Sequence, residues 1–166
     1  MTLYLVVPVL FFVAILQASA VPHLRIWGVF PDLPLLFVVC WGLLRGTRAG
    51  LIWGLIAGLF LDLLSGTPAG AATVALAAVG FVAGLAQRSA FRAQLVLPIA
   101  VTALSTVLYD LMLLLAMLLA GRAVLWIESL ARIILPSAIL NLLLLPAVYF
   151  LLRGLYRRFG QQEMEW

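Results

Sequence analysis

The residues that could do chemistry in this chain are a few polar side chains embedded in long apolar runs. Asp62 and Asp110 lie in two such runs, and Asn141 lies in a third. Glu128 and Arg132 are four residues apart, in the favourable order for an ion pair on a helix. Because a polar group in hydrocarbon is costly, we expect that these side chains can all face the protein interior. They predict either a polar pocket open to one side or a closed internal network. For Glu128 and Arg132, a solvated ion pair at the rim of the bundle is the favoured interpretation.

Two carboxylates that share a proton would point to an aspartyl protease, the first catalytic chemistry to consider. Tyr109 and Asp110 resemble one half of the motif of intramembrane aspartyl proteases. The other half requires Gly-x-Gly-Asp, whereas Asp62 follows the run GLFL. The sequence also lacks a zinc-protease HExxH, a Walker loop and a nucleophile elbow, and it holds a single histidine. We therefore predict no catalytic residue, no metal site and no cofactor.

The elements that position these residues must be membrane-spanning helices. Of the 166 residues, 66% are hydrophobic and 10% are charged, whereas a soluble domain carries about 25% charged residues. The composition predicts a single all-α membrane domain over residues 1–166, a bundle of six transmembrane helices with a short cytoplasmic tail over 154–166. The expected helices are 3–21, 30–45, 49–64, 68–87, 93–121 and 125–153. We expect the last two to be kinked at Pro98, Pro136 and Pro146.

Arginine placement predicts the orientation of these helices. All ten basic residues are arginines, and cytoplasmic ends of membrane helices carry the excess of positive charge. With the N-terminus in the cytoplasm, seven arginines are cytoplasmic: Arg45, Arg48, Arg88, Arg92, Arg153, Arg157 and Arg158. The other three are Arg25, Arg122 and Arg132. We predict cytoplasmic N- and C-termini, and no nucleic-acid partner, because the arginines lie at helix ends rather than in one patch.

Glycines recur at helical spacing in the middle of the chain. Residues four apart lie on one face of a helix, and a face of small residues lets another helix approach closely in lipid. The first such face holds Gly50, Gly54 and Gly58, and the second holds Gly80 and Gly84. We predict that at least one of these faces binds a partner helix. The alternative is that both faces pack only within the bundle.

A turn motif follows the first glycine face. The residues Ser65, Gly66, Thr67 and Pro68 form a sequence that ends one helix and starts the next. We expect Asp62 to hold this turn by accepting hydrogen bonds from the amides or hydroxyls of Ser65 and Thr67.

The run from Gly54 to Gly84 resembles the signature of the MreD family of rod shape-determining membrane proteins. The signature has an aspartate after a glycine-rich helix, a Ser-Gly-Thr-Pro turn, a glycine two residues on, and a small-residue helix that ends in glycine. These features fall on Asp62, Ser65, Gly66, Thr67, Pro68, Gly70 and Gly84. The sequence Pro31-Asp32-Leu33 and the chain length fit the family as well.

The resemblance implies a non-enzymatic scaffold or regulatory subunit of the bacterial cell-elongation complex, located in the inner membrane. It implies an MreC-like bitopic partner and, through that partner, MreB-like filaments, a RodA-like glycosyltransferase and a class B penicillin-binding protein. The family is also similar in fold to the substrate-binding subunits of energy-coupling-factor transporters. The alternative function is therefore a vitamin-type substrate-binding subunit, with its pocket around Asp110, Asn141 and Arg132.

Overall fold

The fold was analysed in a computed structural model that describes residues 2–19, 31–65, 70–87, 96–121 and 134–159. Over these residues the chain is all-helical and contains no sheet, which confirms the predicted fold class for them. The helices are α1 (Thr2–Ser19), α2 (Leu33–Arg45), α3 (Thr47–Ser65), α4 (Ala71–Leu85), α6 (Val96–Leu119) and α8 (Leu135–Phe159). Three segments are long and apolar enough to cross a membrane: Thr47–Leu64, Val96–Leu119 and Leu135–Gly154. The apolar helices Val7–Ser19, Leu33–Arg45 and Ala71–Leu85 are shorter.

The last helix differs most from its expected bounds of 125–153. It continues to Phe159 and so takes in the first part of the expected tail, while positions 125–133 lie outside the described residues. Pro136 is the second residue of α8 and Pro98 the third residue of α6. Backbone N–H groups in a first turn have no partner within the helix, so proline is tolerated there. Of the three prolines expected to kink these helices, Pro146 lies well inside its described helix.

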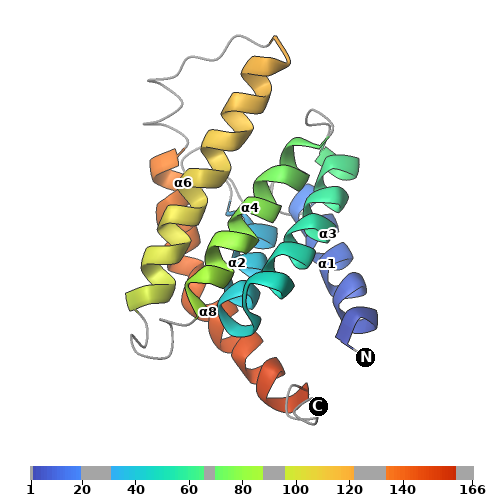
Figure 1. The fold of residues 1–166 in the computed structure, drawn as a ribbon, viewed down its shortest axis with the longest axis vertical. Coiled ribbons are helices and arrows are strands. Elements are labelled where there is room, and N and C mark those ends of the chain that lie inside the picture. Colours follow the sequence, from blue (N-terminus) through green and yellow to red (C-terminus); the bar gives the residue numbers. More distant parts are fainter. Residues whose placement is uncertain (1, 20–30, 66–69, 88–95, 122–133, 160–166) are drawn as a thin grey trace.

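The helices alternate in direction along the chain (Figure 1). α1, α3 and α6 run towards one end of the bundle, and α2, α4 and α8 run back. The start of α1 and the end of α8 consequently lie at the same end, together with the junction between α2 and α3. Arg45, Arg48 and Arg153 all belong to this arginine-bearing end.

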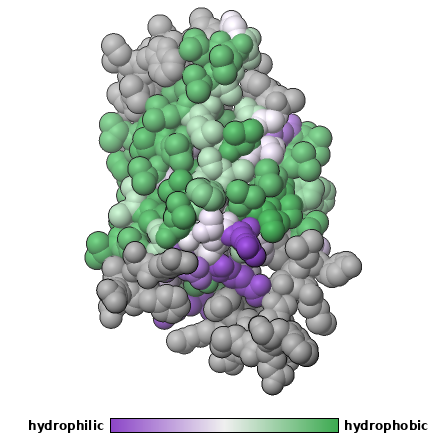
Figure 2. All heavy atoms as spheres, viewed as in Figure 1, coloured by the Kyte–Doolittle hydropathy of each residue, from purple (hydrophilic) through white to green (hydrophobic). Residues whose placement is uncertain are grey.

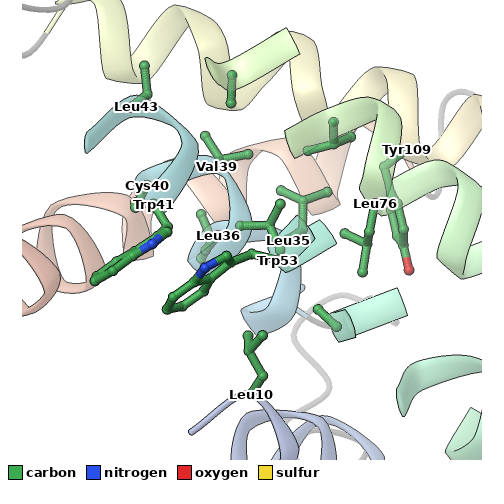
Figure 3. Close-up of a cluster of buried hydrophobic side chains, with 14 of the residues drawn as sticks. Leu10, Leu35, Leu36, Val39, Cys40, Trp41, Leu43, Trp53, Leu76 and Tyr109 are labelled. Atoms are coloured by element: carbon green, nitrogen blue, oxygen red, sulfur yellow. The ribbon is translucent and has the colours of Figure 1, made fainter. Parts of the chain in front are cut away.

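Helix α2 is the centre of the bundle. It packs against each of α1, α3, α4, α6 and α8, and nine of its 13 residues are buried. Its side chains make up much of the apolar core, where Leu35, Leu36 and Val39 meet residues such as Leu76 of α4 (Figure 3). A helix that is apolar on nearly all sides suits a buried position, and this short segment takes one in the middle of the bundle.

The outer surface is as apolar as the core. Large hydrophobic side chains stay exposed on every described helix except α2, with Leu119 80% exposed at the end of α6. Figure 2 shows this hydrophobic surface over most of one face, with hydrophilic residues gathered near the end where α2 joins α3. Such a surface suits contact with lipid tails rather than water.

Candidate functional site

The two glycine faces meet each other between α3 and α4. A Cβ atom added to Gly50 would overlap the carbonyl oxygen of Gly80, and a Cβ atom added to Gly80 would overlap the carbonyl oxygen of Gly50. A Cβ atom added to Gly54 would likewise overlap the carbonyl oxygen of Leu76 in α4. Farther along the contact, Gly58 lies against the backbone of Thr73 in α4, and Gly84 lies against the backbone of Thr47 in α3.

All five glycines predicted to bind a partner helix lie in the contact between α3 and α4, as in the alternative stated above. Glycine on both sides of a contact brings two backbones into van der Waals contact. That one of these faces binds a partner helix stays a prediction.

Asp62 caps the first turn of α4 from outside that helix. One carboxylate oxygen accepts a hydrogen bond from the backbone N–H of Ala72 at 3.0 Å. The other accepts from the backbone N–H of Thr73 at 3.0 Å and from its hydroxyl at 2.6 Å. The first N–H groups of a helix have no partner in the helix itself, and a carboxylate there also complements the helix dipole. Asp62 therefore joins the end of α3 to the start of α4.

The residue before α4 completes this junction. Gly70 adopts a left-handed conformation with φ of 89°, which glycine takes without strain. The expected hydrogen bonds from Ser65 and Thr67 to Asp62 stay a prediction, because Gly66, Thr67 and Pro68 and the side chain of Ser65 lie outside the described residues. The described part of the motif, Asp62 and Gly70, thus marks the entry into α4.

The polar side chains of α6 and α8 form two rungs between these antiparallel helices. On the first rung, the hydroxyl of Ser137 donates to the carboxyl Oδ2 of Asp110 at 2.8 Å. On the second, Nδ2 of Asn141 donates to the hydroxyl oxygen of Thr106 at 3.2 Å. All four side chains are buried. The rungs are one helical turn apart on each helix, so they fix the register of α6 against α8.

Asn141 also connects these two hydrogen-bonded pairs to the centre of the bundle. Its Oδ1 accepts a hydrogen bond from the backbone N–H of Asp32, directly before α2, at 2.9 Å. From the other side, Gln17 of α1 accepts from the backbone N–H of Leu33 at 3.1 Å, and its amide lies 3.4 Å from Oδ1 of Asp32. Four helices thus meet around Asp32.

The sequence identified Asp110 and Asn141 as polar interior residues but missed Thr106, Ser137 and Gln17. The spacing of 106 to 110 and of 137 to 141 is the only signal that could have paired them, since both are one turn apart. Glu128 and Arg132 lie outside the described residues. Their expected place in a pocket beside Asp110 therefore stays a prediction.

The hydroxyl of Ser137 has two acceptors within hydrogen-bond distance. They are Oδ2 of Asp110 at 2.8 Å and the backbone oxygen of Ile134 at 3.0 Å. Ser137 therefore connects Asp110 of α6 to the start of α8.

Replacement of Asp110 tests this account. We expect Asp110→Asn to keep the fold, because the amide oxygen can also accept a hydrogen bond from Ser137, while Asp110→Leu removes this bond between α6 and α8 and lowers stability by about 0.5–1.5 kcal/mol. Thermal unfolding in detergent compares the two variants, with the exposed Leu111→Asn as the control for an added amide on the same helix. Equal destabilisation by Asn and Leu would contradict a stabilising hydrogen bond between Ser137 and position 110.

The fold and this interior define a class of protein. The chain forms a bundle of apolar helices, locked by close glycine contacts and by an internal polar network, with the character of a multi-pass membrane protein. The chain belongs to the MreD family, described as rod shape-determining protein MreD, which matches residues 1–159. The resemblance seen in the sequence is thus confirmed, and membership implies a role in determining rod shape. Comparison with curated proteins and with solved structures gave no match.

Proposed function

We propose that this protein is a non-enzymatic scaffold of the bacterial cell-elongation complex. It resides in the inner membrane with both termini in the cytoplasm, binds an MreC-like bitopic protein, and supports peptidoglycan synthesis and cell shape. Through that partner it is linked to MreB-like filaments, a RodA-like glycosyltransferase and a class B penicillin-binding protein. The observation that carries the proposal is the match to the MreD family over residues 1–159.

The interior of the bundle supports a scaffold. Asn141 is 0% exposed and bonds to α2 and α6 at once, and Asp110 is bonded to α8. Polar groups that bind one another hold helices in a fixed arrangement, which is what a platform for other proteins needs. A vitamin-binding subunit would instead need its polar groups to converge on an open cavity. We therefore do not propose the transporter alternative.

The arginine-bearing end supports the orientation. Arg45, Arg48 and Arg153 share one end of the bundle, at the side of both helical termini of the described chain. By the distribution of positive charge in membrane proteins, this is the cytoplasmic end.

Mild-detergent purification of the tagged protein from its own host tests the function. We expect mass spectrometry to find a single-span protein with a large periplasmic domain in stoichiometric amount. An unrelated tagged multi-pass protein from the same membrane is the control for general carry-over. A bound vitamin, or an ATPase pair in place of the single-span protein, would overturn the proposal.

A further inference from the structure

We propose that the half-buried strip of α2 between α1 and α8 is the docking site for a partner's single transmembrane helix, one that carries a hydrogen-bond donor beside Asp32. The inference rests on the proposed scaffold function and adds to it the surface and the kind of side chain by which the partner is held.

The order of the helices around α2 leaves one opening. α1 packs on α3, α3 on α4, α4 on α6, and α6 on α8, and each of the five also touches α2. Within the described residues, α1 and α8 share no comparable contact, so the ring does not close. Figure 1 shows these two helices on different sides of α2. A sixth helix in this position would complete the ring around α2.

The half-buried apolar residues of α2 form one continuous strip. They are Leu33, Phe37 and Leu44, and Trp41, which is buried with 7% exposure, lies between them. The spacing of four, four and three residues places all of them on one face of the helix. At about 1.5 Å per residue the 13-residue helix gives this strip a length of about 20 Å. Its shape and apolar character suit the side of another helix.

At the cytoplasmic end of the strip, two tryptophan side chains pack against each other. The rings of Trp41 and Trp53 are stacked, with centroids 4.2 Å apart and an angle of 22° between the planes. The guanidinium of Arg45 lies over Trp41, 5.4 Å from the ring centroid. Figure 3 shows the two indoles side by side next to the central helix. Stacked rings lose little conformational freedom when a partner covers them.

The opposite end of the strip carries the polar group that selects a protein over lipid. Asp32 is only half-buried, and its Oδ2 accepts no hydrogen bond from any described residue. Its Oδ1 has only the long 3.4 Å contact with Gln17. An acyl chain offers a carboxyl group no hydrogen bond, so contact with lipid here is unfavourable. A helix with a hydroxyl, amide or basic side chain at this level supplies the missing donor.

Site-specific photo-crosslinking in the full-length protein, expressed with the co-purifying single-span partner, tests the docking site. A photoreactive phenylalanine analogue is placed at Phe37 of the strip and, as the matched control, at Phe81, which is 43% exposed on α4. We expect at least tenfold more crosslinked partner from position 37 than from position 81. The captured peptide should lie in the partner's membrane span and contain a donor side chain within about one helical turn of the level of Asp32.

The outcomes separate the two proposals. If the partner co-purifies but crosslinks equally or preferentially from position 81, the docking site is overturned and the scaffold function stands. Crosslinks from position 37 only to lipid, or only to a second copy of this chain, overturn the docking site as well. Absence of any single-span partner in the purification overturns the scaffold function itself. Because the analogue keeps an aromatic ring at position 37, loss of folding does not obscure the result.

Discussion

Replacing Gly80 with alanine is expected to separate α3 from α4 and to cause the largest loss of stability of any single methyl addition in the described chain. The new Cβ atom would overlap the backbone carbonyl of Gly50, and a backbone cannot move aside as a flexible side chain can. Overpacking in a well-packed core costs about 1–3 kcal/mol, and a clash with backbone belongs at or above the top of that range. Thermal unfolding of the purified protein in detergent measures the loss. We expect Gly50→Ala to behave in the same way.

Gly154→Ala provides the matched control for these substitutions. Gly154 also lies within a helix, but a Cβ atom added there meets nothing within 4 Å. Alanine at that position should be neutral or raise stability by up to about 1 kcal/mol, because it favours helix more than glycine does. If Gly80→Ala were as mild as Gly154→Ala, the direct backbone contact between α3 and α4 would be contradicted.

Replacing Asp62 with alanine is expected to have the second-largest effect, by freeing the start of α4. The carboxylate accepts three hydrogen bonds, from two backbone N–H groups and one hydroxyl, and Ala72 at this site is buried. Each buried donor left without a partner costs about 1–3 kcal/mol, so the total is several kcal/mol unless water reaches the site. Thermal unfolding, together with protease accessibility near Gly70, measures the effect.

Two further variants separate capping from simple loss of charge at this site. Thr73→Val removes only the hydroxyl contact and should cost about 1 kcal/mol. Leu63→Ala, next to Asp62 on the exposed side of α3, should be close to neutral. If Asp62→Ala were no worse than Thr73→Val, the backbone N–H groups of α4 would not depend on this carboxylate.

The sequence predicted the helices well because hydrophobic runs and glycine spacing are local patterns. It also predicted that the glycine faces allow close approach, since the spacing that puts Gly50 and Gly54 on one face is a property of one helix. It could not say which helix fills such a face. That choice depends on the opposing surface, and here the small residues of α4 are the complement of those of α3.

The polar interior was predictable in its members but not in its pairings. Asp110 and Asn141 stand out in sequence because each is polar within an apolar run. The contact of Asn141 with the N–H of Asp32 joins residues 109 positions apart, and no local pattern encodes such a contact. Asp62 shows the same limit on a shorter scale, because the sequence directed attention to the adjacent turn while its described bonds reach residues 10 and 11 positions away.

The two rungs between α6 and α8 also limit how the bundle can move. A slide of α8 by a fraction of a turn would break both hydrogen bonds, whereas a slide by one full turn, about 5.4 Å, would bring Asn141 opposite Asp110 and re-form a single bond. The two hydrogen bonds therefore allow α8 only a few discrete positions along α6, one helical turn apart, rather than a continuous sliding motion. Any force that a neighbouring protein exerts along α8 would be resisted up to a threshold and then released in one step.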